Sequence, residues 1–177
     1  YSAGCATVEN MVIYPHGAAA RRPGTQYVAE VKTSANSTRI IPFEFNTEQT
    51  YILELGNLYM RFYRDNGQIL EGNKTITAIT KANPGVITCS SHGYLSGDEI
   101  LITSIVGMTE LNNQRFLVVK IDANTFSLTD TAGVAINTTN FTTYGSAGTM
   151  NRVYEITTPY TTAQLFDIKF AQSADVM

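Results

Sequence analysis

The stretch TYILELGNLYMRFYR, residues 50–64, decides the fold of this chain. Apolar side chains alternate along both of its halves, at Tyr51, Leu53 and Leu55 and then at Leu58, Met60 and Phe62. This alternation is typical of half-buried strands. Gly56-Asn57 lies between the halves, and both residues tolerate the positive φ that tight hairpin turns require. The stretch therefore predicts an antiparallel hairpin with a two-residue turn.

Further segments extend this hairpin into a sheet. Asp65-Asn66-Gly67 predicts a second tight turn, and Pro42 indicates an edge strand or bulge because proline cannot donate to a ladder. The other elements expected in this unit are a helix over residues 1–12, strands over 26–32, 41–45 and 68–70, a short helix capped by Thr161-Thr162-Ala163-Gln164, and a final strand over 167–173.

A second run of short strands, from about Thr75 to Met150, interrupts this unit. Its strands are expected at residues 76–80, 86–89, 99–105, 115–121, 125–128 and 148–151, with a long mobile loop over 130–148. Short strands at this spacing predict a small barrel. We therefore expect a mainly β fold: a discontinuous antiparallel β-sheet unit, residues 1–73 plus 152–177, with a small β-barrel domain inserted at residues 74–151.

Composition limits the classes of partner. The 177 residues carry a net charge of -3, whereas nucleic-acid binding usually calls for a basic face, so nucleic acid is not expected as a primary ligand. No apolar run approaches the ~20 residues that cross a bilayer, so no membrane span is expected. The chain begins at Tyr1 without Met, and we expect it to be a piece of a longer polypeptide.

No pattern in the sequence predicts chemistry. Cys5 and Cys89 have neither metal-ligand nor CxxC spacing and are interpreted as free thiols. His92 follows Cys89 by three residues, but a turn-forming His beside Gly93 is the simpler interpretation, and neither an orienting group nor an oxyanion pocket can be identified. We expect no enzymatic activity, no catalytic residue, no cofactor and no metal.

Two groups of residues are candidates for subunit contacts. Arg21 and Arg22 either bind carboxylates at an interface or are solvated charges in a turn. Tyr59, Arg61 and Tyr63 share one face of the second hairpin strand. They form either an aromatic and cationic platform for a glycan or another subunit, or a face that another part of the full-length chain covers.

A third candidate is a loop in the barrel segment, formed by Met108, Thr109, Glu110, Leu111 and Asn112. Loops held by a rigid barrel often bind partners. The loop is therefore either a recognition loop or a plain connector.

Several strings in the flanking parts carry a family resemblance. They are residues 10–17 (NMVIYPHG), 21–25 (RRPGT), 39–45 (RIIPFEF), 51–56, 61–64, 154–156, 158–160 and 170–175. Through them the flanking unit resembles the amino-terminal region of bacteriophage and prophage tail proteins and, more distantly, the tail tubular protein that forms the nozzle of short-tailed phages. The resemblance implies a non-enzymatic structural protein, homo-oligomeric with other tail subunits, found in the virion and in the bacterial cytoplasm before assembly.

The interrupting segment carries its own strings, at residues 92–94 (HGY), 96–98 (SGD), 107–112 (GMTELN) and 125–128 (TFSL). They resemble a module that recurs in phage tail proteins and is similar to the barrel-shaped first half of the catalytic-cysteine region of ubiquitin-activating enzymes. That half does not carry the reactive cysteine, so the resemblance implies a barrel and no ubiquitin chemistry. The alternative function is host attachment, with the barrel binding a surface glycan.

Overall fold

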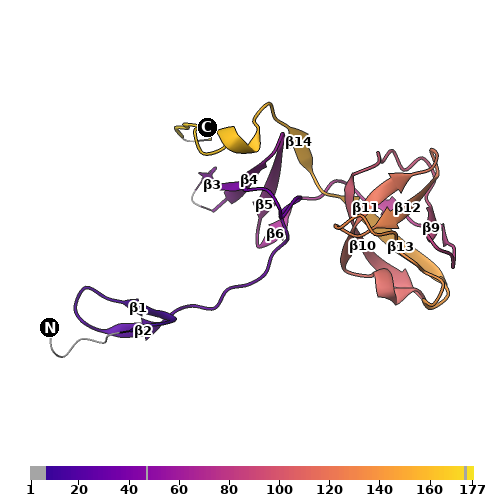
Figure 1. The fold of residues 1–177 in the computed structure, drawn as a ribbon, viewed down its shortest axis with the longest axis horizontal. Helices are drawn as coiled ribbons and strands as arrows, with labels where there is room; N and C mark the ends of the chain where they lie inside the picture. Colours follow the sequence, from indigo (N-terminus) through magenta and orange to yellow (C-terminus); the bar gives the residue numbers. More distant parts are fainter. Residues whose placement is uncertain (1–6, 47, 174) are drawn as a thin grey trace.

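The protein is mainly β, as the sequence predicts, in a computed structural model that describes residues 7–46, 48–173 and 175–177 (Figure 1). Strands form a projecting hairpin, one open sheet and one curled sheet. We call residues 74–151 the insert and the remaining described residues the host unit. Among the described residues, no helix is long and apolar enough to cross a membrane.

The host sheet contains β3 (Arg39–Glu44), β4 (Thr50–Gly56), β5 (Tyr59–Arg64), β6 (Gly67–Gln68) and β14 (Glu155–Thr157). Its order is β14-β5-β4-β3, all antiparallel, and β6 also pairs with β5. The predicted hairpin is present, but its turn lies one residue later than expected. Gly56 pairs with Tyr59, so Asn57 and Leu58 form the turn, with Leu58 at a φ of 66°. A Cβ at Gly56 would lie 2.1 Å from the Tyr59 ring, so the close approach of this ring requires glycine at position 56.

One face of the host sheet packs on the carboxyl-terminal segment. The fully buried core consists of Ile41, Leu53, Leu55 and Leu165. The predicted short helix is the 3-10 helix η2 (Thr162–Gln164), and Gln164 accepts a hydrogen bond from the Thr161 amide at 3.0 Å. The strand predicted over 167–173 does not form. Arg39 Nη1 donates to the carbonyls of Leu165 and Ile168 at 2.7 and 2.8 Å, so Arg39 binds backbone acceptors of this segment that a ladder would otherwise use.

The outer edge of β3 is closed to a further strand. The amide of Phe45 bonds to Gln49, so in this antiparallel register Ile40, Pro42 and Glu44 direct their backbone groups outward. Pro42 has no N–H, and the side-chain amide of Gln172 binds the backbone of Glu44. Both features block edge pairing.

The insert forms the second sheet, from β7 (Lys74–Thr75), β8 (Ala78–Ile79), β9 (Val86–Thr88), β10 (Glu99–Val106), β11 (Gln114–Lys120), β12 (Thr125–Thr129) and β13 (Ser146–Arg152). The order is β7-β13-β10-β11-β12-β9-β8. Because β7 and β8 belong to one short run of chain, this run pairs with both ends of the sheet and curls it into the predicted small barrel.

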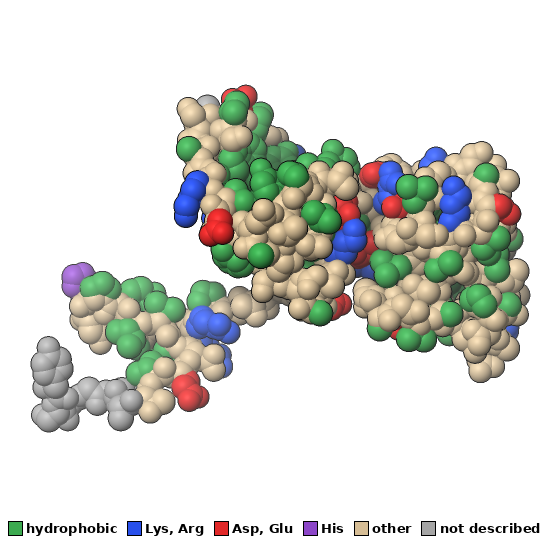
Figure 2. Space-filling model, turned by 45° about the horizontal axis from the view of Figure 1, so that its top comes forward, with side chains coloured by type: hydrophobic (Ala, Val, Ile, Leu, Met, Phe, Trp, Pro, Cys, Tyr) green, Lys and Arg blue, Asp and Glu red, His purple; other side chains and the backbone are tan. Residues whose placement is uncertain are grey.

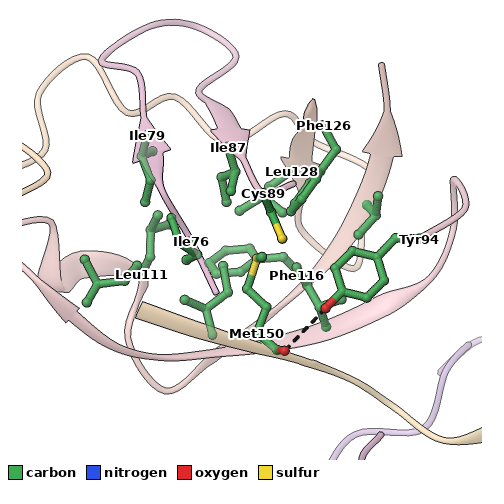
Figure 3. Packing of buried hydrophobic residues seen from close by; sticks show 14 of the residues in the cluster. Ile76, Ile79, Ile87, Cys89, Tyr94, Leu111, Phe116, Phe126, Leu128 and Met150 are labelled. Carbon is green, nitrogen blue, oxygen red and sulfur yellow. Dashed lines mark hydrogen bonds between the residues drawn. The ribbon is translucent and has the colours of Figure 1, made fainter. Parts of the chain in front are cut away.

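The barrel encloses a well-packed apolar core (Figure 3). Its buried members come from strands β8 to β13, from the segments beside them and from the 3-10 helix η1 (Thr109–Leu111). They are Ile76, Ile79, Ile87, Cys89, Tyr94, Ile100, Ile102, Ile105, Met108, Leu111, Phe116, Val118, Phe126, Leu128 and Met150. The Tyr94 hydroxyl donates to the Met150 carbonyl at 3.3 Å, which satisfies its polar end inside the core.

The amino-terminal segment forms a hairpin of β1 (Met11–Ile13) and β2 (Ala19–Arg21), which we call the arm. Figure 1 shows the arm at the end of an extended connection, away from both sheets. The predicted helix over 1–12 is wrong for Met11 and Val12, and residues 1–6, with Cys5, lie outside the described residues. The strand predicted over 26–32 is also absent, because no neighbouring strand pairs with that segment.

A substitution at Gly148 tests how closely the side chains of the barrel core pack. It has a φ of 101°, and a Cβ there would lie 2.8 Å from Ile105 and 3.1 Å from Ile76. We expect Gly148→Ala to lower the free energy of unfolding by about 1–3 kcal/mol more than Gly133→Ala. Gly133 is the matched control, because its φ is 85° and nothing lies within 4 Å of its Cβ position. Equal losses in denaturant unfolding of the two variants would contradict tight packing at this corner.

Candidate functional site

A buried charged junction joins the host unit to the insert. Arg61 on β5 is 1% exposed, and its Nη1 lies 2.8 Å from Oε2 of Glu99 on β10. Nη1 makes no hydrogen bond of good geometry, so this contact acts as an ion pair. Arg61 Nε donates to Glu155 on β14 at 3.0 Å, and Lys32 also binds Glu155. One guanidinium thus holds carboxylates from both units.

Opposing effects set the charge of Arg61. Burial disfavours a charged guanidinium, but the carboxylates of Glu99 and Glu155 outweigh that penalty and raise the pKa of Arg61. Arg115 on β11 reinforces the site from the insert, with Nη1 3.5 Å from Glu99 and in contact with the side-chain oxygen of Gln68 on β6. A buried pair of this kind fixes orientation, and the loss of one partner leaves an uncompensated charge.

Two tyrosines complete the face around Arg61. The hydroxyl of Tyr59 donates to Oε1 of Glu54 at 2.7 Å, and the hydroxyl of Tyr63 donates to Oε2 of the same carboxylate. Burial and the neighbouring Glu54 raise the pKa of both phenols well above the usual value of 10. The carboxylate of Glu54, which is fully buried, is therefore satisfied by two neutral donors.

A second link lies where the chain enters and leaves the insert. Arg152 binds Glu71 at 2.8 Å and Asp98 at 2.9 Å, and the amide of Glu71 donates to the Arg152 carbonyl at 2.8 Å. The hydrogen bonds that Arg152 donates to Glu71, which has the larger effect, and to Asp98 raise the pKa of Arg152. A polar cavity of about 150 Å³ separates this link from Arg61, and its charged lining is already paired.

The open-platform interpretation of Tyr59, Arg61 and Tyr63 is corrected by this geometry. Tyr59 and Arg61 are 4% and 1% exposed, and Tyr63 is half-buried. Other parts of this chain cover two of the three residues, because Lys32 lies over the Tyr59 ring and Glu99 of the insert pairs with Arg61. Tyr63 instead lines an open groove on the same face of the host sheet, and its role in a subunit contact stays a prediction.

Arg21 and Arg22 are exposed on the arm, so the structure leaves them accessible to a partner. The loop 108–112 is anchored in the barrel. Met108 and Leu111 are buried in its core, and the Asn112 side chain exchanges two hydrogen bonds with the backbone of Ile105. Recognition by this loop stays a prediction.

Glu110, a half-buried residue of that loop, accepts a hydrogen bond from the amide of Thr142 at 2.7 Å, and this hydrogen bond lowers the pKa of Glu110. Its carboxylate thus holds the long loop of residues 130–145 against η1. The mobility expected of that long loop stays a prediction.

Cys89 and His92 have structural surroundings. The Cys89 thiol is buried, and burial raises its pKa. His92 is 1% exposed, with Nδ1 accepting from the Tyr94 amide and Nε2 3.0 Å from the Asp122 carbonyl. These contacts fit the turn role expected of His92. Across the described part of the chain, no group of three His, Cys, Asp or Glu residues is placed to hold a metal ion.

Sequence reasoning missed the acidic half of the junction. Glu54 carried a usable signal, because a lone carboxylate inside the apolar run YILELG calls for a buried partner. Glu99 and Glu155 carried none, since nothing local connects either residue with Arg61.

Comparison with known proteins identifies the module in the insert. Residues 82–154 match the ubiquitin-activating enzyme E1 FCCH domain. The chain is 37% identical over 82 residues to ubiquitin-like modifier-activating enzyme 1 of Oryctolagus cuniculus and 35% identical to that of Homo sapiens. Each alignment covers 44% of this chain and only 7% of the relative. The insert is thus an FCCH-type module, as its resemblance implied.

The junction makes a stability prediction. We expect Arg61→Met to lower the free energy of unfolding by about 3–5 kcal/mol, because Glu99 would stay buried with weaker compensation. The control is Arg64→Met, which removes an exposed pair with Asp65 and should cost at most about 1 kcal/mol. Urea unfolding followed by circular dichroism measures both. Equal losses would show that the Arg61 contacts do not stabilise the fold.

The junction also predicts sensitivity to alkali. Because the folded state retains the protons of Tyr59 and Tyr63 above the pH at which the unfolded chain releases them, the free energy of unfolding should fall as pH rises above about 10. Urea unfolding at several alkaline pH values tests this. The double variant Tyr59→Phe/Tyr63→Phe should show a shallower fall, with Tyr94, whose pKa burial also raises, accounting for part of the remainder. An unchanged slope would refute the assignment.

Proposed function

We propose that this chain is a non-enzymatic structural component of a phage tail, a tube or nozzle-type subunit that acts through protein–protein contacts in a symmetric, homo-oligomeric assembly. In this proposal it resides in the virion, after synthesis in the bacterial cytoplasm, and the insert decorates the outer surface. The tail-protein resemblance of the flanking strings motivates the proposal. The observation that carries it is the distribution of apolar surface.

Apolar side chains are exposed mainly on the host unit. Among the described residues, 17 of the 22 exposed large hydrophobic side chains belong to the host unit and five to the insert. Figure 2 shows hydrophobic side chains gathered over the host unit and along the arm. Large exposed apolar patches mark interaction surfaces in folded proteins.

The two cores show the opposite distribution. In the described residues, four side chains form the fully buried host core, whereas fifteen form the barrel core. Beside this host core, an open apolar hollow of about 330 Å³ lies on the host sheet, lined by the core residue Leu53 and by Phe43, Tyr51, Phe62 and Met177. A unit with so small a core and so much apolar surface gains stability by burying that surface against other subunits.

The insert has the properties of an independent module. Its curled sheet leaves only two-residue strands at the ends of the strand order, and its core is complete within its own sequence. This supports a decorating role more than a role in holding the assembly together. The glycan-binding alternative has less support, because the buried and hydrogen-bonded residues of loop 108–112 leave few free groups to recognise a sugar.

Composition of purified particles tests the proposal. Mass spectrometry of particles from the encoding phage or induced prophage should find this chain at a fixed copy number. We expect Phe166→Asp in the host unit to reduce that copy number about tenfold or more, because it places a charge on an interface. Val134→Asp in the insert is the matched control, since the two side chains are 61% and 62% exposed, and it should be incorporated normally.

Absence of the wild-type chain from particles would reject the tail proposal. Equal incorporation of both variants would reject the host unit as the assembling surface.

A further inference from the structure

The arm packs against no other element among the described residues of its own chain. Each described side chain from residue 10 to 28 is exposed except Ala20, which is half-exposed. Met11, Val12, Ile13 and Tyr14 are 48%, 43%, 63% and 50% exposed. An isolated two-stranded hairpin is marginally stable in water, because it buries too little apolar surface. The arm therefore requires a receiving surface, and its place in Figure 1 puts that surface outside its own chain.

The charge of the arm limits the receiving surface. Residues 10–29 contain Arg21, Arg22 and His16 and no Asp or Glu. The chain that follows, residues 30–177, contains ten Lys or Arg residues and fourteen Asp or Glu residues. An apolar site with an acidic rim on another copy of the chain would complement the arm.

The host sheet offers such a site. A groove of about 590 Å³ lies between residues 28–31 and strands β3 to β5, with Ile40 and Ile52 on its sheet side. Glu48 and Asp65 lie at its rim. Asp65 pairs with Arg64, which also lines the groove, whereas Glu48 has no ion pair among the described residues. Ile40 is 54% exposed, so the groove is open to an incoming side chain.

The groove offers the arm a binding site on the face of the host sheet, although the outer edge of β3 is blocked. Pro42 and Gln172 close the outer edge of β3, so an incoming hairpin cannot extend the sheet as another strand there. It can instead place its apolar side chains in the groove, on the face of the sheet.

We propose that the arm of one copy occupies this groove on a second copy. In this arrangement Met11 to Tyr14 cover Ile40 and Ile52, and Arg21 and Arg22 face Glu48. The arm and the groove are different surfaces, so the contact is head-to-tail and generates a ring when the rotation between copies closes. The inference rests on the homo-oligomeric assembly of the proposed function and supplies its contact.

Mixing two complementary variants of the full-length protein tests this contact. Ile13→Arg disables the arm and keeps the groove, whereas Ile40→Arg disables the groove and keeps the arm. Both positions are exposed, so both variants should fold, which circular dichroism verifies. In sedimentation velocity each variant alone should be monomeric. Their mixture should form a 1:1 heterodimer and nothing larger, because only one intact arm and one intact groove remain.

Val106→Arg is the control, since this insert residue is 57% exposed and lies far from the groove lining in sequence and sheet. It should oligomerise like the wild type. A charge exchange gives a second measurement: Arg21→Glu/Arg22→Glu should weaken self-association about tenfold, and adding Glu48→Arg should restore it.

The outcomes separate this inference from the tail proposal. A mixture that stays monomeric, or single variants that assemble like the wild type, would overturn the arm and groove contact, while presence in particles would still uphold the tail proposal. A wild type that is found in particles but is monomeric in solution, with no heterodimer on mixing, would likewise overturn the contact between copies. If the chain is absent from particles, the heterodimer alone decides the contact.

Discussion

The arrangement of the two units depends on the burial of one guanidinium. Arg61 is a host residue, yet the carboxylates that make its burial tolerable come from Glu99 in the insert and Glu155 after it. The chain must therefore complete the barrel and return to the host sheet before Arg61 has both partners. Folding of the host unit is coupled in this way to docking of the insert, although each sheet has its own apolar core.

The two apolar cores differ in how far they stabilise their own units. The barrel stabilises itself, because its sheet curls around its own core and satisfies polar groups such as the Tyr94 hydroxyl. The host sheet is thin, with one face shared between the insert and an open groove and the other between the carboxyl-terminal segment and an apolar hollow. This contrast in buried surface, more than any single residue, supports an assembly role for the host unit.

The alternation of apolar residues predicted those elements of the fold that depend on residues close together in the sequence. Alternation found the host hairpin and most barrel strands, but it placed the turn one residue early, because alternation does not show which residues pair across the turn and Gly56 pairs with Tyr59. Alternation also grouped Tyr59 with Arg61 on one face without showing what covers that face. That information lies in Glu99, distant in sequence, and no local rule contains it. The anchoring of loop 108–112 could have been predicted from the sequence, because Met108 and Leu111 are three residues apart and one 3-10 turn places such residues on the same side.

The chain leaves the host unit after Glu71 and returns to it after Arg152, the last residue of β13, and the backbones of these two residues share a hydrogen bond. Because these two ends lie side by side, domains of many shapes could be inserted between them, and evolution could exchange one inserted domain for another without changing the host fold. The exchange has a chemical condition. A replacement must present a carboxylate to Arg61 and another acceptor to Arg152, and a module without them would leave a buried cation poorly compensated. Two acidic residues of the inserted module, at the positions of Glu99 and Asp98, thus determine whether it can dock on this host unit.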